Sequence, residues 1–342
     1  MEVRGRRVLV VYLFSGLGDG ILLAPVLKAL AAAGAKKPIG VLAPPLPASA
    51  LAHLGLDLRL HRTSEGRAIQ RAGYDIAVDL TFRADQDGRG WLARSGAPVR
   101  LGFIGPGERL EDTGLTAGRL DRRHYTDRHF SAALIEPLRE LGIVAPRYDL
   151  PWRVSKDQAR RADRLLPRRS KVPRVLLVPG SRSAEKRWPE RTFAAIAHHA
   201  QEAHRASVVL AGAPRERPAL VELARAAGVS SSSIYSGRDL GVLLALIARS
   251  EVVVSNDTGP VHFAFLLGVP TLALFSVMSP SAWGPPLPRP NQALVRASSG
   301  GASERDEARA LEIAALLLAQ PPARDRVRCI SARDRIRILP AP

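Results

Sequence analysis

A glycine-rich turn near the amino terminus carries the first side chain that could do chemistry. It reads FSGLGDG from Phe14 to Gly20, between an apolar run of strand length and a segment with helical periodicity. Such a turn would deliver backbone amides to the amino end of a helix, where an anion or a closely approaching ligand can bind. The helix dipole would hold Asp19 ionised, which suits a general base facing a hydroxyl group. The alternative is that Asp19 only caps the helix.

A dinucleotide-binding fingerprint fits this turn poorly. Glycines stand at positions 16, 18 and 20, whereas the spacing G-x-G-x-x-G would need a glycine where Ile21 stands. The next strand-like run ends at Ala43 and Pro44, where an acidic residue would be needed to bind a ribose. Asp19 would also repel a phosphate in the same cradle. These features disfavour an NAD-dependent oxidoreductase, which is retained as an alternative.

A second turn brings basic side chains to a predicted helix start. A strand-like run ends in the segment from Val178 to Ser181, and Lys186 and Arg187 follow shortly before Pro189, a good first residue for a helix. Lys186 and Arg187 could clamp a diphosphate, and the Ser181 hydroxyl could add a contact. The alternative is a solvated surface, which is the commoner setting for such a basic pair.

The third and most specific cluster reads SNDTGPVH from Ser255 to His262. An apolar strand would end where it starts, and a helix beginning at Gly259 would point its amino end at the same edge of the sheet, which makes another anion site. Asp257 and Thr258 could equally be helix caps without a ligand. A lone histidine such as His262 is more often structural than catalytic.

Further acidic residues are weaker candidates for a functional site. Glu216 follows another strand-like run, so its carboxylate would lie near a strand end where a ribose could bind. Asp85 and Asp87 form an Asp-x-Asp pattern, but no further ligand is obvious and a solvated turn is favoured over a metal site. The sequence contains neither a Walker A motif nor a nucleophile elbow.

These turns require a framework that alternates strands and helices, and the sequence has the pattern of parallel βαβ units. We expect strands at Arg7–Leu13, Pro38–Ala43, Tyr74–Leu80, Val99–Phe103, Val172–Val178, Ala206–Ala211, Glu251–Ser255 and Thr271–Phe275. We expect helices at Ile21–Ala33, His124–Leu141, Pro189–Ala203, Pro214–Ala227, Gly259–Leu267 and Glu304–Gln320. The predicted fold class is α/β, with Rossmann-like domains at 1–150 and 151–342 joined by a linker at Gly142–Arg153. Their carboxyl strand ends would frame a cleft.

Length and composition exclude several other classes of protein. The chain has 342 residues, enough for two domains, and its 46% hydrophobic and 24% charged residues are typical of a globular protein. The single cysteine, Cys329, excludes a disulfide framework and a multi-cysteine zinc site. No apolar run reaches the roughly 18 residues of a membrane span. Because no secretion signal is recognisable, we expect a cytoplasmic protein.

The formal net charge of +18 predicts attraction to polyanions. Only six of the fifty basic residues are lysines, and the abundance of Arg, Ala and Pro could come from a GC-rich coding sequence alone. Few aromatic side chains stand among the basic ones, whereas a stacking surface for single-stranded nucleic acid would need interleaved Phe, Tyr or Trp. We therefore expect an anionic surface or substrate, and no nucleic acid partner.

In combination, the turns resemble those of the heptosyltransferases of lipopolysaccharide core assembly, glycosyltransferase family 9. The resemblance spans about positions 7 to 285 and is carried by Arg7–Ala33, Tyr74–Leu80, Ala97–Phe103, Val178–Phe193 and Ser255–Pro285. It departs from the family pattern after the last predicted strand, where Phe275–Pro280 reads FSVMSP in place of the more usual Phe-Gly-Pro-Thr.

The resemblance implies a GT-B fold, with two Rossmann-like domains facing across a cleft, and inverting transfer without a metal or other cofactor. Asp19 falls on the family's catalytic base, next to Gly18 in the acceptor-binding turn, and Lys186 falls on the family's diphosphate-binding lysine. The implied donor site comprises Ser181, Lys186, Glu216, Asp257, Thr258, Gly259 and His262.

The expected reaction moves a heptose, or a related sugar, from an ADP-activated donor to an anionic glycolipid acceptor of the lipopolysaccharide core type. The protein would contact the cytoplasmic face of the inner membrane peripherally. Hypothetical acceptor contacts are Arg83, Arg89, Arg100 and Arg128. Two further alternatives are a nucleotide-sugar transferase of the same fold with another donor and acceptor, and a non-catalytic sugar- or polyanion-binding relative.

Overall fold

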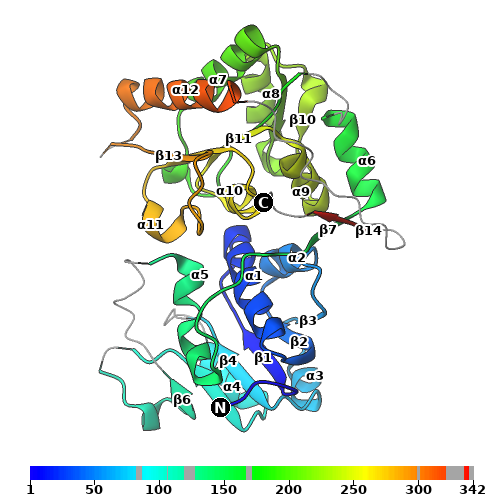
Figure 1. Ribbon diagram of the computed structural model, residues 1–342, viewed down its shortest axis with the longest axis vertical. Helices are drawn as coiled ribbons and strands as arrows, with labels where there is room; N and C mark the ends of the chain where they lie inside the picture. Colours follow the sequence, from blue (N-terminus) through cyan, green and yellow to red (C-terminus); the bar gives the residue numbers. More distant parts are fainter. Residues whose placement is uncertain are drawn as a thin grey trace. The chain divides into compact units, whose positions relative to one another are not determined.

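The computed structural model describes residues 1–81, 87–105, 107–118, 128–166, 172–298 and 301–320, and the backbone of 335–338. Arg83, Asp85 and Cys329 lie outside the described residues. The chain divides into two compact units, Met1–Leu150 and Pro151–Pro342, each built around its own sheet (Figure 1).

The first unit holds a parallel sheet in the strand order β3-β2-β1-β4-β5-β6. Its strands are β1 (Arg7–Val11), β2 (Lys36–Leu42), β3 (Leu58–His61), β4 (Ile76–Asp79), β5 (Val99–Gly102) and β6 (Ala117–Gly118). Its α-helices are α1 (Leu17–Ala32), α2 (Pro45–Leu51), α3 (Gly66–Arg71), α4 (Gly88–Arg94) and α5 (Phe130–Ala133), with 3-10 helices at Leu110–Asp112 and Glu136–Leu141.

Helices cover both faces of this sheet, which explains why its central strands are apolar along nearly their whole length. Alternate residues of β1 point to opposite faces. Leu9 and Val11 pack in one cluster with Ile69 of α3 and Leu92 of α4. On the other side of the unit, the Ser131 hydroxyl donates to the Leu22 carbonyl at 2.8 Å and fastens α5 to α1.

The second unit repeats the arrangement, with a parallel sheet in the order β10-β9-β8-β11-β12-β13. Its strands are β8 (Arg174–Val178), β9 (Ser207–Ala211), β10 (Ile234–Tyr235), β11 (Val252–Asn256), β12 (Thr271–Phe275) and β13 (Gln292–Arg296). Its helices are α6 (Lys156–Leu165), α7 (Glu190–His204), α8 (Arg217–Ala226), α9 (Leu240–Arg249), α10 (Gly259–Leu267), α11 (Pro280–Trp283) and α12 (Glu304–Leu318), with 3-10 helices at Ala184–Lys186, Pro214–Glu216 and Ser231–Ser233. A separate antiparallel pair joins β7 (Trp152–Ser155) to β14 (Arg335–Ile338).

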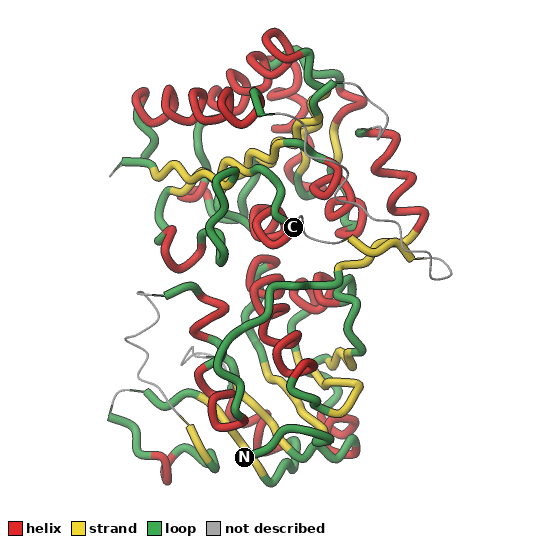
Figure 2. The backbone as a smooth tube through the Cα atoms, viewed as in Figure 1, coloured by secondary structure: helices red, strands yellow, loops and turns green. Residues whose placement is uncertain are grey.

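The core of the second unit lies on both faces of its sheet. Leu272 and Leu274 of β12 pack in the cluster that includes α7, α8 and α12, whereas Ala273 and Phe275 pack on the side of α10. Helices α7 and α12 lie side by side in Figures 1 and 2, and an ion pair between Arg191 and Glu307 joins them.

Most expected elements occur within a few residues of their predicted bounds, but one is wrong. The long helix expected at His124–Leu141 is replaced, in its described part, by the short α5 and the 3-10 helix at Glu136–Leu141. Pro137 explains the break, because proline lacks the N–H of a helical hydrogen bond and its ring collides with the preceding turn. The strands β3, β6, β7, β10, β13 and β14 and the helices α2, α3, α4, α6, α9 and α11 were not predicted from the sequence.

The shared strand order places a comparable crevice in each unit. In open parallel sheets, ligands bind beyond the carboxyl ends of the strands, at the point where the strand order reverses direction. That point falls between β1 and β4 in the first unit and between β8 and β11 in the second. Within the described residues, no helix has the length and apolar character to cross a membrane.

Candidate active site

The turn after β1 places Asp19 at the third residue of α1, immediately after the helix starts. Its Oδ2 atom accepts a hydrogen bond from the N–H of Gly16, the N-cap residue, at 2.7 Å. Gly16 has no room for a side chain, because an added Cβ would lie 2.5 Å from the same Oδ2. The capping contact weighed from the sequence is therefore present, and it holds the partly exposed carboxylate in a defined place.

Tyr12 also holds this turn in place. Its hydroxyl donates to the backbone carbonyl of Asp19 at 3.0 Å. Burial, and to a smaller extent the charge of Asp19, raises the pKa of Tyr12 well above its usual value, so the phenol stays protonated and keeps donating. Gly18 is buried within the turn, and Gly20 approaches α2 so closely that a Cβ would lie 2.6 Å from Cα of Pro47. The glycines thus let the turn fit against its neighbours.

In the second unit, a lysine from one turn meets an aspartate from the other. Lys186 Nζ lies 3.0 Å from Asp257 Oδ2. Lys186 closes the turn after β8 and is 25% exposed, whereas Asp257 follows β11 and is 2% exposed. Burial raises the pKa of Asp257 even though the Lys186 ammonium opposes that rise. The pair lies at the strand-order reversal of this sheet, and the Lys186 side chain remains partly open to solvent.

His262 lies beside this pair on the first turns of α10. Its Nε2 is 4.0 Å from Asp257 Oδ1, and its side chain packs near Phe265 and Trp283. Burial, assisted by the charge of Lys186, lowers the pKa of His262 to about 3, so the imidazole is neutral at physiological pH. Its Nδ1 is buried and has no hydrogen-bond partner within the described structure.

The amino end of α10 follows Asp257 closely in the chain. Thr258 is its N-cap residue in extended conformation, and no side chain caps the first turn. The Thr258 hydroxyl instead donates to the Asn256 carbonyl at 3.3 Å. Pro260 has no N–H, and the Val261 N–H donates to the Thr258 carbonyl at 3.1 Å, so the Gly259 N–H is the amide of this first turn that keeps the capacity to bind an anion.

Hydrogen bonds fix the turn that carries Lys186. The Arg187 guanidinium donates twice to the Ser181 carbonyl, at 3.0 and 2.7 Å, so Arg187 holds the turn and does not extend as a clamp. The buried Ser181 hydroxyl accepts from the Ser183 N–H at 3.2 Å. Asn256 ties the two strand ends together, because its side-chain amide donates to the Pro179 carbonyl at 2.6 Å and accepts from the Trp188 N–H at 3.2 Å.

Glu216 lies across the ends of β8 and β9. Its Oε2 accepts from the Ala213 N–H at 2.7 Å, and a Cβ on Gly212 would lie 2.8 Å from that oxygen. Gly180, at the end of β8, likewise has no room for a side chain against this carboxylate. The position agrees with the expectation of a carboxylate near a strand end, although one oxygen already serves as a local cap.

The arginines suggested as acceptor contacts lie on separate elements. Arg89 of α4 donates to Glu108 at 2.6 Å and to the Phe103 carbonyl at 3.0 Å, and Arg128 pairs with Glu136. Arg100 stands on β5, with its Nε buried and without a partner in the described structure. The described structure gathers no group of three or more His, Cys, Asp or Glu side chains suited to a metal ion.

Comparison with known sequences decides the family. The sequence profile described as glycosyltransferase family 9 (heptosyltransferase) matches residues 62–313, well over half of the chain. The chain belongs to glycosyltransferase family 9. Two curated relatives are the lipopolysaccharide core heptosyltransferase OpsX of Haemophilus influenzae, 28% identical over 147 residues, and lipopolysaccharide heptosyltransferase 1 of Pseudomonas aeruginosa, 29% identical over 216 residues. The matches cover 42% and 63% of this chain, and they span about half the length of these relatives, 42% and 58%.

Solved family 9 structures have the same fold. A glycosyltransferase family 9 protein from Veillonella parvula superposes with a TM-score of 0.76 at 21% identity, over 93% of this chain and 98% of the other. The E. coli heptosyltransferase WaaC with ADP gives 0.68 at 18% identity, over 91% and 99%. The fold is therefore GT-B, as the sequence resemblance implied.

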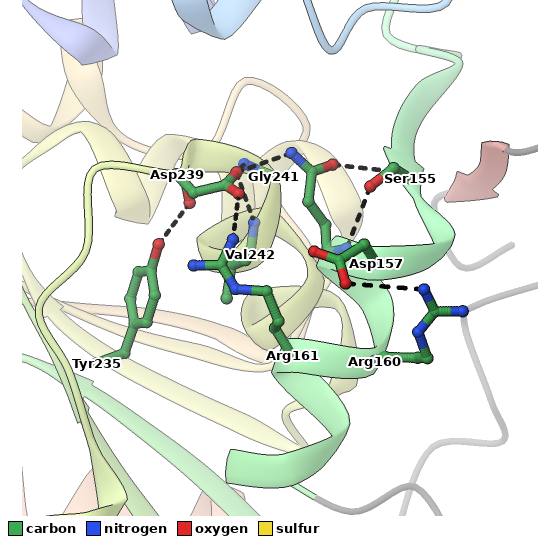
Figure 3. Close-up of polar contacts among 9 residues, drawn as sticks. Ser155, Asp157, Arg160, Arg161, Tyr235, Asp239, Gly241 and Val242 are labelled. Carbon is green, nitrogen blue, oxygen red and sulfur yellow. Dashed lines mark hydrogen bonds and ion pairs between the residues drawn. The ribbon is translucent and has the colours of Figure 1, made fainter.

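Two acidic residues of this family 9 chain were missed from the sequence. Asp79 ends β4 and is buried, but from the sequence it is one more polar residue at the end of an apolar run. Asp239 caps α9, and its carboxylate also accepts from Gln158 at 2.7 Å and from Arg161 at 2.8 Å (Figure 3). Both Asp239 oxygens are used in joining α6 to α9, so this residue is structural.

Proposed function

We propose that the chain is an inverting, metal-independent heptosyltransferase that uses an ADP-activated donor and a lipopolysaccharide core-type acceptor at the cytoplasmic membrane face. The contact between Lys186 and Asp257 carries the proposal, because it sets a cation at the amino end of α10, a helix end that no side chain caps. Support comes from the relatives named as lipopolysaccharide heptosyltransferases and from the E. coli relative solved with ADP.

In the proposed mechanism, Asp19 accepts the proton of the acceptor hydroxyl as that oxygen attacks the anomeric carbon of the donor sugar. The bond from this carbon to the diphosphate oxygen breaks in the same displacement, and ADP leaves with the bonding electrons. Attack from the face opposite the leaving group inverts the anomeric centre. Gly18, as part of the same turn, contacts the acceptor through its backbone.

The second unit stabilises the departing diphosphate in this proposal. Lys186 donates to its oxygens, and the Gly259 N–H at the start of α10 faces the same negative charge. Thr258 and Ser181 supply hydroxyl donors, and His262, being neutral, donates or accepts without adding charge. Glu216 receives the ribose hydroxyls with the carboxylate oxygen that does not cap Ala213.

Anionic acceptors would contact the arginines of the first unit. Arg100 is the best described candidate, because its buried Nε lacks a partner in the described structure. Single replacement of Arg89, Arg100 or Arg128 by Ala should raise the acceptor KM and leave the donor KM unchanged. Unchanged acceptor kinetics in all three variants would remove this assignment, while Arg83 remains a proposal from sequence.

The decisive experiment measures heptose transfer from ADP-heptose to a heptose-free lipopolysaccharide core acceptor by the full-length protein. Asp19→Asn should lower kcat by about 100-fold or more and leave ADP binding intact, because only the proton acceptor is lost. Lys186→Ala should weaken ADP binding, and the exposed Lys36→Ala serves as control. Transfer from a UDP or GDP donor instead would replace the donor, and failure to transfer from any donor would favour a sugar-binding relative.

A further inference from the structure

Asp79 is a buried acid that the proposed mechanism leaves unused. It is the last residue of β4, pairs in register with Val11 at the end of β1, and is 6% exposed. The ends of these two strands form the strand-order reversal of the first unit. The turn bearing Asp19 leaves from the same place, since α1 directly follows β1.

Thr81 connects Asp79 to that turn. The Thr81 N–H donates to Asp79 Oδ1 at 2.8 Å, and the Thr81 hydroxyl also donates to this carboxylate. The same hydroxyl oxygen accepts from the Leu13 N–H at 2.9 Å. A hydroxyl has a single proton, so its donation to Asp79 turns a lone pair toward Leu13. The contact extends the pairing of β1 and β4 beyond the Leu80 N–H to Val11 carbonyl bond at 2.9 Å.

The Asp79 carboxylate packs tightly against the start of α4. Gly88, the first residue of α4, lies so close that any side chain there would overlap the carboxylate. Burial raises the pKa of Asp79 to about 7, and the raising effect of Asp87 adds to it, whereas hydrogen bonds from Thr81 and the charge of Arg89 oppose it. Arg89 and Asp87 are the charged groups that face it from the described part of the chain.

We propose that Asp79 is a positioning residue for the transfer reaction: in its ionised form it orients Thr81, which holds Leu13 and so fixes the turn that presents Asp19. The proposal rests on the proposed function of that turn. Hydrogen bonds to an ionised carboxylate are shorter and stronger than those to a neutral one. The turn is therefore held more firmly once Asp79 loses its proton, and kcat should rise with pH through about 7.

The test compares Asp79→Asn and Thr81→Val with two controls. Thr81→Ser keeps the hydroxyl, and Asp75→Asn removes a partly exposed carboxylate at the opposite end of β4. Asp79→Asn and Thr81→Val should lower kcat about tenfold, because a shift of the base by under about 1 Å can cost up to about 100-fold. The donor KM should not change, since the donor groups lie in the second unit. Asp79→Asn should also lose the rise of kcat near pH 7.

Hydrogen exchange of the amides from Leu13 to Gly16 gives a readout that needs no activity. Exchange should accelerate in Asp79→Asn and Thr81→Val, and it should remain as in the wild type in Thr81→Ser and Asp75→Asn. Faster exchange in Asp79→Asn and Thr81→Val, together with a wild-type chain that transfers no heptose, would overturn the proposed function and leave the role of Asp79 in holding the turn. Unchanged exchange, or an active Asp79→Asn variant with the wild-type pH profile, would overturn the inference alone.

Discussion

Lys186 Nζ lies 3.0 Å from Asp257 Oδ2, and this contact joins the turn after β8 to the start of α10. The two partners differ in environment, because Asp257 is almost fully buried and Lys186 reaches solvent. A diphosphate that binds Lys186 must therefore compete with a buried carboxylate for the same ammonium group.

Removal of the lysine should affect stability and binding separately. Lys186→Ala leaves Asp257 buried without its cation, so the free energy of unfolding should fall by about 3 kcal/mol. ADP affinity should fall as well. The double variant Lys186→Ala/Asp257→Asn should regain most of the free energy of unfolding, measured by denaturant unfolding. It should not regain ADP affinity, measured by calorimetry. Recovery of ADP binding in the double variant would show that Lys186 does not contact the diphosphate.

ADP binding should be linked to proton uptake. Asp257 already has a raised pKa because of its burial, and Lys186 limits that rise. When Lys186 turns to the diphosphate, this limit weakens, the pKa of Asp257 rises further, and the carboxylate takes up a proton. Affinity should therefore increase as pH falls. Calorimetry in two buffers of different ionisation enthalpy measures the uptake, and Asp257→Asn provides the baseline because ADP itself titrates. Equal proton uptake by both proteins would contradict the linkage.

Gly16→Ala should impair catalysis through steric overlap alone. The φ angle of Gly16 is −82°, which alanine adopts without strain, but the new methyl group would lie 2.5 Å from Asp19 Oδ2. The carboxylate must then move, so we expect kcat to fall about tenfold with ADP affinity unchanged. Gly66→Ala is the matched control, since its Cβ would meet nothing closer than 3.6 Å. Equal kcat values for the two variants would show that the position of Asp19 is not critical.

Asp79 should lower stability as the pH rises. Its folded-state pKa of about 7 exceeds the ordinary value of 3.8, so the folded chain holds a proton that the unfolded chain has released over that interval. Stability should therefore fall between about pH 4 and pH 7 and level off above, by up to about 4 kcal/mol at 1.36 kcal/mol per pKa unit. Asp79→Asn should lack this fall, and urea unfolding at pH 5 and pH 8 measures the difference. If the unfolding free energies of Asp79→Asn and the wild type differ by the same amount at both pH values, the raised pKa of Asp79 is contradicted.

Local patterns predicted much of this fold because its central strands are continuous apolar runs and its turns carry glycine and proline. The helix α10 and the strand β12 have the bounds expected from sequence. The short strand β10 and the pairing of β7 with β14 depend on contacts distant in sequence, which local patterns do not encode.

The sequence was sufficient to predict several residues of the candidate site, but not the contacts between them. The sequence indicated that Lys186 and Asp257 serve anion binding, yet their ion pair forms only when two separate strands end side by side. Asp79 was missed for a similar reason, since its burial depends on Gly88 of a later helix. Arg187 was considered from the sequence as part of a diphosphate clamp or of a solvated surface, whereas in the structure its guanidinium donates to the Ser181 carbonyl.

The two units share one strand order but carry different side chains at the equivalent edge of the sheet. In each sheet, the turn after one central strand (β1 or β8) lies beside the carboxyl end of the neighbouring strand (β4 or β11). In one unit this turn bears Asp19 and the adjacent strand ends in the buried acid Asp79, whereas in the other the turn bears Lys186, which pairs with Asp257. Under the proposed function, one copy of this scaffold accepts a proton and the other binds phosphate oxygens, because the side chains on the two turns carry charges of opposite sign.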